Sequence, residues 1–322
     1  MKAVRVHTFG GPDVLQFEDV PDPSPNAGEV VVKVEAAGLN FIDVYHRIGL
    51  YKVQVPVTLG QEAAGTISAV GAGVTEWRVG DRVAYAGPLG SDAEYQVVPV
   101  ARLVALPAGV STKQGAAVML QGMTAHYLAT STYPLAPGDT CLVHAGAGGV
   151  GLLLTQIARM KGARVITTVS TEEKATLSRE AGADEVIRYA DQDFAAEVGR
   201  LTGGAGVQVV YDSVGQATFT ASLDCLAVRG MIVAFGQSSG AVAPVDPLVL
   251  SQKGSLFMTR PTLIHYSAKR EELLWRTGDL FRWIVDGSLR IRMEFEFALR
   301  DTAAAHRALE ARKTTGKVLI IP

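Results

Sequence analysis

The stretch DTCLVHAGAGGVG, residues 139–151, runs from apolar residues into glycines at positions 146, 148 and 151. This spacing is typical of the turn that joins a buried strand to a helix at a dinucleotide site. We expect Gly146 to permit the tight turn, Gly148 to let the backbone approach a pyrophosphate, and Gly151 to let the helix pack closely. The helix N-terminus adds N–H donors and a positive dipole. The predicted turn comprises Gly146, Gly148, Gly149, Val150 and Gly151.

The residues that follow complete a strand–helix–strand unit. A helix is predicted over 150–161, ending before Gly162, and residues 163–169 (ARVITTV) read as a buried parallel strand. An NAD-specific site places an acidic residue about 20 residues after the glycines, to hold the ribose 2′-hydroxyl. Hydroxyls and a cation occupy this region here, which suits a 2′-phosphate and favours NADPH. The residues concerned are Ser170, Thr171, Lys174 and Tyr189.

A capping interpretation competes with the phosphate interpretation. Ser170 or Thr171 would then only cap the helix that follows, and Lys174 would be a solvated side chain. Glu172 and Glu173 also weigh against NADPH, because either carboxylate could reach a ribose.

Size and charge favour a two-domain protein that acts on a small molecule. A chain of 322 residues and 34.0 kDa is too long for one small core. The net charge is −2 and no basic run is present, which argues against a nucleic-acid partner. No apolar run approaches the ~20 residues that span a bilayer, and the N-terminus has no signal-peptide pattern. We therefore expect a soluble, cytoplasmic protein with no membrane partner.

Metal ligands are scarce in the sequence. Cys141 lies in a predicted strand and Cys225 inside a helix predicted over 218–228, so they form no C-x-x-C pair. We expect both to be small buried hydrophobes. The six histidines are scattered, with no H-x-x-x-H spacing. The sequence therefore predicts no metal site.

The hydrophobic pattern changes near residue 111. Residues 1–110 hold short β patterns separated by turn residues, typical of a mostly antiparallel β domain. Helices then alternate with six candidate strands, at 142–145, 164–169, 185–189, 207–215, 231–236 and 255–261. This pattern predicts a doubly wound parallel sheet, an α/β fold. An amphipathic helix over 271–287 and two β-like runs follow. We expect domains of residues 1–122, completed by 266–322, and of residues 123–265.

Seven strings along nearly the whole chain carry a resemblance to a known family: AAGLNFIDVYHRIGLY (36–51), GQEAAGTISAVGAGV (60–74), GDRVAY (80–85), HAGAGGVG (144–151), VYDSVG (210–215), GSLFMTRP (254–261) and TTGKVLIIP (314–322). On these motifs the chain resembles the zeta-crystallin-like NADPH:quinone oxidoreductases, a zinc-free branch of the medium-chain dehydrogenase/reductase superfamily. The resemblance implies a GroES-like catalytic domain, a Rossmann domain, and an active site in the cleft between them.

The chain departs from zinc-dependent relatives at the ligand positions. Asn40 stands where those relatives place a Cys ligand, and Gln61 stands in place of the His of their G-H-E motif. Glu62 alone cannot hold zinc in a tetrahedral site, so we expect it to be a hydrogen-bonded structural carboxylate.

Without a metal Lewis acid, the protein must lower the activation barrier by positioning the reactants alone. A quinone or activated enone can accept a hydride in this way, because it needs no strong polarisation first. Asn40 would bond the acceptor oxygen or the nicotinamide ribose, and Tyr45 would donate a hydrogen bond or proton to the developing oxyanion. The alternative for Asn40 is a residue that only forms a turn, and the alternative for Tyr45 is an aromatic side chain that only packs.

Further cofactor contacts are expected in both halves. The resemblance implies that Thr124 lies at the nicotinamide end and that Arg260 and Lys317 are cationic contacts, although both cations could be surface charges. Ser213, Phe235 and Gly236 follow strand ends, where ligands of open parallel sheets bind.

Three functions are considered. The leading one is an NADPH-dependent, zinc-independent quinone reductase. The second is a zinc-free reductase of an enal or enoyl double bond. The third is a cofactor-binding structural or RNA-contacting protein, which the net acidity disfavours. We also expect a homodimer, because the apolar run 255–261 at the predicted sheet edge favours self-pairing of two Rossmann domains.

Overall fold

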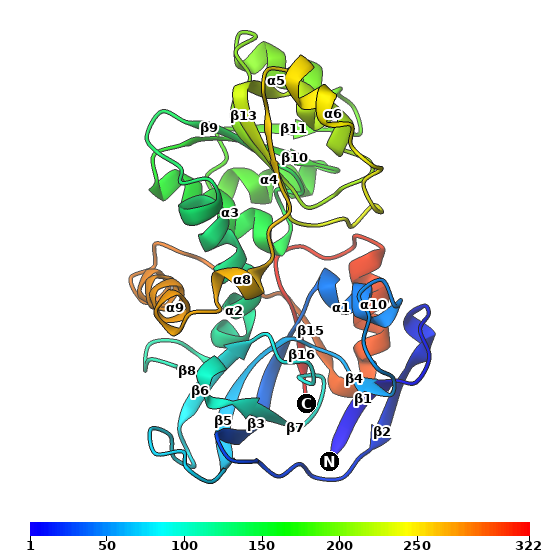
Figure 1. Ribbon diagram of the computed structural model, residues 1–322, viewed down its shortest axis with the longest axis vertical. Helices are drawn as coiled ribbons and strands as arrows, with labels where there is room; N and C mark the ends of the chain where they lie inside the picture. Colours follow the sequence, from blue (N-terminus) through cyan, green and yellow to red (C-terminus); the bar gives the residue numbers. More distant parts are fainter. The chain divides into compact units, whose positions relative to one another are not determined.

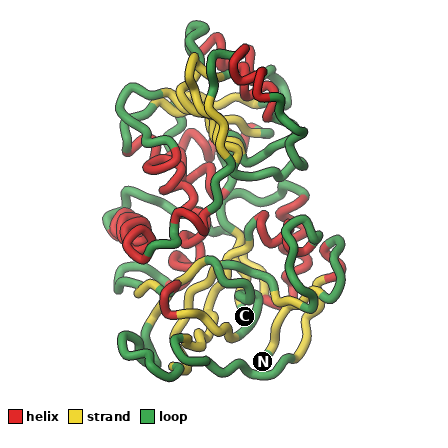
Figure 2. The backbone as a smooth tube through the Cα atoms, in the orientation of Figure 1, coloured by secondary structure: helices red, strands yellow, loops and turns green.

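The computed structural model describes all residues from 1 to 322 and forms two compact units. Unit 1 comprises Met1–Met123 and Ser267–Pro322, and unit 2 comprises Thr124–Tyr266. Figure 1 follows the chain through both units, and Figure 2 marks their helices and strands. None of the helices combines the length and apolar character needed to cross a membrane.

Unit 2 is built on a six-stranded sheet in which every pair of neighbours is parallel. The order β11-β10-β9-β12-β13-β14 is typical of dinucleotide-binding folds, so the predicted doubly wound sheet is confirmed. The strands are β9 (Thr140–Val143), β10 (Arg164–Val169), β11 (Glu185–Arg188), β12 (Val207–Asp212), β13 (Leu226–Ala234) and β14 (Phe257–Thr259). The helices are α3 (Gly149–Met160), α4 (Glu172–Glu180), α5 (Phe194–Leu201), α6 (Phe219–Asp224), α7 (Pro247–Gln252) and α8 (Leu263–Tyr266).

Apolar runs fill the centre of this sheet. Leu142, Ile166 and Val210 are fully buried and join one cluster with Phe219 of α6. Continuous apolar runs suit strands that are covered on both faces. Both cysteines are buried and free, as predicted, but Cys225 is the C-cap of α6 and does not lie inside the helix.

Unit 1 contains a seven-stranded sheet and a three-stranded sheet, β2-β1-β4. All pairs are antiparallel except β15 with β16, which matches the expected mostly antiparallel domain. The larger sheet follows β15-β16-β3-β5-β6-β8, with β7 also on β3. The strands are β1 (Lys2–Val6), β2 (Leu15–Asp19), β3 (Glu29–Leu39), β4 (Val57–Thr58), β5 (Glu62–Val70), β6 (Arg82–Ala86), β7 (Tyr95–Pro99), β8 (Val104–Ala105), β15 (Phe295–Ala298) and β16 (Val318–Ile321).

Four helices accompany these sheets: α1 (Phe41–Arg47), α2 (Thr112–Tyr127), α9 (Arg270–Val285) and α10 (Thr302–Glu310). The boundary between the units falls within α2, after Met123. The amphipathic pattern over 271–287 therefore corresponds to α9, and the last two β-like runs correspond to β15 and β16.

A buried arginine fixes the C-terminal end of α1. Arg47 is 1% exposed and forms a bidentate pair with Glu310 of α10, at 2.7 and 2.8 Å. Its guanidinium also lies 2.9 Å from Nδ1 of His306. Because a guanidinium only donates, Nδ1 is the acceptor, and burial together with the Arg47 charge lowers the pKa of His306 to about 3. Helix α1, which begins directly after Asn40, is thus tied to α10.

Candidate functional site

The glycine-rich turn joins β9 to α3 and leaves the N-terminus of α3 uncapped by any side chain. Gly148 is the N-cap residue and its N–H donates to Ala145 O at 2.8 Å. The N–H of Gly146 donates to Thr168 O at 3.0 Å, which ties the turn to β10. A helix of 12 residues with no side-chain cap presents backbone donors and a positive dipole, which is what a pyrophosphate needs.

The glycines provide space more than backbone freedom. The positive φ in this turn belongs to Ala145, at 54°, and not to any of the predicted glycines. A Cβ on Gly146 would lie 2.6 Å from Thr167 Cβ, and one on Gly151 would collide with Ala145 O. A Cβ on Gly148 would stand 3.1 Å from the same oxygen. The role expected for Gly146 is thus corrected: its side chain is excluded by β10, while Ala145 makes the tight turn.

The far end of the dinucleotide site lies where β10 and β11 finish together. Val169 pairs with Arg188 in the parallel register, and the Tyr189 N–H donates to Val169 O at 3.1 Å. Ser170 and Tyr189 therefore follow neighbouring strand ends. Such ends are where ligands of open α/β sheets bind.

The two acidic residues at this end, Glu172 and Glu173, already have ionic or hydrogen-bonding partners. Glu172 pairs with Arg179 at 2.7 Å and with Arg188 at 3.5 Å, and these partners, Arg179 first, lower its pKa. Glu173 accepts from its own backbone N–H and from the Thr171 hydroxyl, which lowers its pKa as well. Thr171 is also the N-cap of α4, where it accepts from the Lys174 N–H at 3.3 Å, and its predicted contact with a 2′-phosphate stays a prediction.

Three more predicted residues meet at the ends of β12, β13 and β14. Gly236 packs against Ser213, since a Cβ on Gly236 would lie 2.6 Å from Ser213 O. Arg260 donates to Ala234 O at 2.7 Å, so its guanidinium lies at the end of β13 beside Phe235. Thr124, also predicted, is 6% exposed on α2 and is the first residue of unit 2.

Asn40 sits in a buried polar cluster of unit 1. Its Nδ2 donates to Gly38 O at 3.0 Å and to Glu62 Oε1 at 2.8 Å. Its Oδ1 accepts from Gln121 Nε2 and from Lys317 Nζ, both at 3.0 Å. All four hydrogen-bonding positions of the carboxamide have partners within unit 1, so a bond to an acceptor or ribose would replace one of them. The predicted contact of Asn40 with an acceptor or ribose stays a prediction.

Lys317 and Glu62 form the ion pair at the centre of this cluster. Their side chains are 1% and 0% exposed, and Nζ of Lys317 contacts Oε1 of Glu62 directly. Glu62 also accepts from the Leu120 N–H at 2.6 Å, which confirms the expected structural carboxylate. Burial lowers the pKa of Lys317 to about 7, against the raising effect of the Asp43 carboxylate. The predicted contact between Lys317 and a cofactor stays a prediction.

Strand register explains why these distant residues meet. Val318 pairs with Leu39, which places Lys317 beside Asn40, and Ala37 pairs with Ala63, which places Glu62 beside Gly38. A Cβ on Gly38 would collide with Glu62 Oε1 and lie 2.5 Å from Lys317 Cε. Glycine at position 38 is therefore what lets the ion pair form.

Gln61 stands at the second position where zinc-dependent relatives carry a ligand, and its side chain is also hydrogen-bonded within the protein. Gln61 Nε2 lies 2.9 Å from His46 Nε2, so the imidazole nitrogen accepts from the amide. Burial lowers the pKa of His46, which keeps it a neutral acceptor. No group of three or more His, Cys, Asp or Glu side chains is arranged to hold a metal ion.

Tyr45 belongs to an aromatic group on and after α1. It is 7% exposed, and its ring meets Tyr51 edge-on with centroids 5.3 Å apart and Phe41 at 6.4 Å. Tyr51 and Gln121 were not among the predicted site residues. The signal for Tyr51 was available in the motif 36–51, whereas Gln121 has only its position one helical turn before Thr124.

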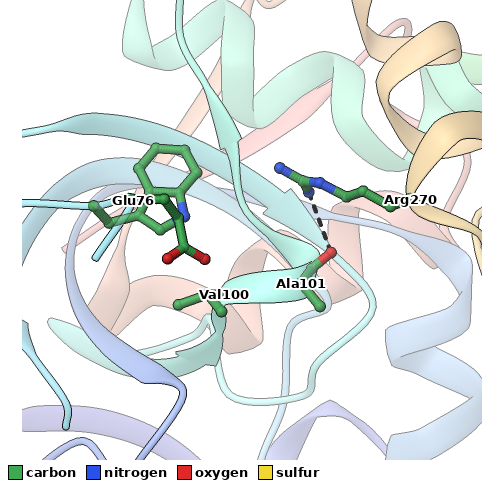
Figure 3. Close-up of a pocket in the computed structure, with 5 residues that line it drawn as sticks. Glu76, Val100, Ala101 and Arg270 are labelled. Carbon is green, nitrogen blue, oxygen red and sulfur yellow. Dashed lines mark hydrogen bonds between the residues drawn. The ribbon is translucent and has the colours of Figure 1, made fainter. Parts of the chain in front are cut away.

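One surface cavity lies apart from all of these residues. It has a volume of about 450 Å³ and is lined by Glu76, Trp77, Val100, Ala101 and Arg270. Figure 3 shows the Arg270 guanidinium directed at the Ala101 carbonyl, to which it donates at 3.2 Å. None of the predicted site residues lines this cavity.

Comparison with known proteins identifies both halves of the chain. Residues 26–108 match the family model of the alcohol dehydrogenase GroES-like domain, and residues 149–270 match that of zinc-binding dehydrogenases. A quinone oxidoreductase of Pseudomonas aeruginosa is 48% identical over 100% of this chain and 99% of its own length. A 2-haloacrylate reductase of a Burkholderia species is 42% identical over 99% of this chain and 98% of its own. The crystal structure of the Escherichia coli quinone oxidoreductase complexed with NADPH superimposes with a TM-score of 0.98 at 43% identity, covering 100% of both chains.

Proposed function

This chain belongs to the quinone oxidoreductase family of the medium-chain dehydrogenases/reductases, and from that membership we propose that it reduces quinones with NADPH, without zinc. The observation that carries the proposal is the full-length match to a quinone oxidoreductase complexed with NADPH. When bound, NADPH supplies a hydride to the quinone and becomes NADP⁺. One proton from the surroundings then completes the hydroquinone.

The residues of unit 2 fit a dinucleotide of this kind. The uncapped first turn of α3 offers N–H donors for the pyrophosphate, and the glycines leave room for it. At the ribose end, the acids are engaged by Arg179, Arg188 and Thr171, so no free carboxylate competes with a 2′-phosphate. We propose that the cofactor is held by Thr124, Gly146, Gly148, Gly149, Val150, Gly151, Ser170, Thr171, Lys174, Tyr189, Ser213, Phe235, Gly236 and Arg260, with Asn40 and Lys317 contributing from unit 1.

The choice of NADPH over NADH provides the first test. Lys174→Ala should weaken NADPH binding by about 1.5–3 kcal/mol, roughly 10- to 150-fold, because a hydrogen bond to a charged group is lost. NADH binding should hardly change. Lys161→Ala is the matched control, since Lys161 is the C-cap at the opposite end of α3. Fluorescence titration of both cofactors measures the effect, and equal losses for NADPH and NADH would refute the assignment.

On the acceptor side we propose that Tyr45 donates a hydrogen bond to the oxyanion that develops on the quinone. Tyr45→Phe should lower kcat by about tenfold or less and leave NADPH affinity nearly unchanged, because the hydroxyl acts in the transition state and water can replace it. Tyr95→Phe in β7 is the control. Unchanged steady-state kinetics in Tyr45→Phe would remove the tyrosine from the mechanism.

A second activity is favoured by the 42% identical 2-haloacrylate reductase, which suggests reduction of a conjugated carbon–carbon double bond. Steady-state NADPH oxidation against quinones, enals and 2-haloacrylates distinguishes the two. If quinone reduction is the main activity, we expect the highest kcat/KM with a quinone. A higher kcat/KM with an enal or haloacrylate would assign the chain to double-bond reduction.

We further propose that the protein acts in the cytoplasm as a homodimer joined through β14. This strand is the last in the sheet of unit 2, and Phe257 and Met258 on it are 57% and 40% exposed. An exposed apolar edge strand favours pairing with a second copy. Light scattering at micromolar concentration should give twice the chain mass of 34.0 kDa, and a single 34.0 kDa species would count against the dimer.

A further inference from the structure

A group of buried polar atoms next to Asn40 has no partner in the fold. Of the nine buried side-chain oxygens and nitrogens without a hydrogen bond, four belong to three residues: Oδ1 of Asp43, Oγ of Ser91, and both carboxyl oxygens of Asp92. These three side chains are at most 1% exposed. Buried polar atoms are normally satisfied, so four of them together call for an explanation.

The four atoms gather around Gly60, which has a φ of +82°. A Cβ at this position would collide with Ser91 Oγ and lie 2.7 Å from Asp92 Oδ1. The backbone N–H of Gly60 also acts on the Asp43 carboxyl, whose pKa it lowers. The carboxyls of Asp43 and Asp92 therefore flank the same glycine and are close enough to repel each other.

A count of charges shows that this cluster cannot be fully ionised. Glu62, Asp43, Asp92 and Lys317 are all buried, and three carboxylates against one ammonium would leave two uncompensated negative charges. Lys317 neutralises Glu62 through direct contact. Uncompensated charge in a protein interior is costly and is usually removed by binding a proton.

The surroundings decide which carboxyl holds the proton. Asp43 Oδ2 accepts from the Asn40 N–H at 2.8 Å, and the Gly60 N–H and the Lys317 charge also favour its ionised form. Asp92 has no donor on either oxygen. Burial raises the pKa of Asp43 to about 7, and burial together with the Asp43 charge raises the pKa of Asp92 well above its usual range.

We propose that Asp92 keeps its proton at neutral pH and donates it to Oδ1 of Asp43, and that this hydrogen bond positions α1 with Asn40 and Tyr45. This one bound proton gives a partner to two of the four unpaired atoms, Oδ1 of Asp43 and one carboxyl oxygen of Asp92. Asp92 is a positioning residue, because it acts through Asp43 on the helix.

The backbone of Asp92 makes it a firm anchor for this purpose. Its N–H donates to Leu59 O at 3.0 Å, and its carbonyl accepts from the Val4 N–H at 2.8 Å. Asp43 occupies the third position of α1, and Arg47 holds the other end of the same helix on α10. The carboxyl pair therefore fixes the N-terminal end of α1, from which Asn40 enters the polar cluster.

Infrared spectroscopy tests the proton directly. At pH 8 a carboxyl with an ordinary pKa of about 4 is ionised. A carbonyl band of an un-ionised carboxylic acid at this pH therefore comes from a carboxyl whose pKa is strongly raised. The wild-type protein should show this band, Asp92→Asn should lack it, and Asp13→Asn, whose carboxyl is 91% exposed, should keep it. Absence of the band from the wild type would overturn the proposal. Asp92 would then be ionised, and a cation instead of the proton would have to compensate its charge.

Kinetics test the positioning role, and this arm rests on the proposed function. Asp92→Asn supplies an amide donor to Asp43 and should keep kcat within about twofold, whereas Asp92→Leu supplies none and should lower kcat at least about tenfold. NADPH affinity should change less than kcat in both variants, because most of the proposed cofactor contacts lie in unit 2. Equal loss of kcat in both variants would contradict positioning by a hydrogen bond. The infrared band needs no turnover and decides on the proton if Asp92→Leu does not fold or the wild type reduces no quinone.

Discussion

Gly151→Ala is expected to weaken NADPH binding at least ~100-fold, about 2.8 kcal/mol, while the rest of the fold persists. The added Cβ would collide with Ala145 O and come within 3.0 Å of Gly146 Cα, and both are backbone atoms that cannot rotate away. The first turn of α3 would have to move away from the glycine turn. The N–H donors would then no longer converge on one point, which is what a pyrophosphate requires.

The matched control is Gly199→Ala in α5, where a Cβ would meet no atom within 4 Å. That variant should bind NADPH like the wild type and gain up to about 1 kcal/mol in stability from helix propensity. Fluorescence titration gives the affinity, and thermal unfolding shows that each variant is folded. NADPH affinity in Gly151→Ala within about threefold of the wild type would contradict the role assigned to this turn.

Lys317→Met is expected to destabilise the protein by about 3–5 kcal/mol, because it removes one partner of a buried ion pair and leaves the other charged. Glu62 would lose its only cationic partner at a position that is 0% exposed. The Asn40 and Leu120 donors would remain, but neither carries a charge. The free energy of unfolding from urea titration measures the loss.

The double variant Glu62→Gln, Lys317→Met provides the control for this prediction. It removes both charges, so most of the lost stability should return. If Lys317→Met alone cost less than about 1 kcal/mol, the pair would be behaving as a solvated surface contact. The same result would reopen the prediction that Lys317 reaches the cofactor.

The architecture of unit 2 was predictable because its signals are local. Continuous apolar runs such as 164–169 identify buried parallel strands, and the spacing of the glycines identifies the turn. The detailed role of Gly146 was not predictable. The positive φ falls on Ala145, and whether Thr167 closes over Gly146 depends on how β10 packs, which the spacing alone does not reveal.

The cluster around Asn40 shows where sequence reasoning ends. Motifs indicated Asn40, Glu62 and Lys317 separately, but their contacts depend on the register of β16 on β3 and of β3 on β5. Asn40 and Lys317 are 277 residues apart in the chain, and no local pattern reports such a pairing. Asp92 carries no motif at all, and its importance follows only from its burial and its unpaired oxygens.

The central claim is that this chain transfers a hydride from NADPH to a quinone and needs no zinc to do so. The most direct measurement is the steady-state rate of NADPH oxidation with a simple benzoquinone, before and after exhaustive chelation, with the metal content determined in both samples. Asn40 and Gln61 are engaged by neighbouring side chains and replace the Cys and His ligands, so we predict no stoichiometric zinc and the same rate in both samples. Stoichiometric zinc together with a rate that chelation abolishes would contradict the claim.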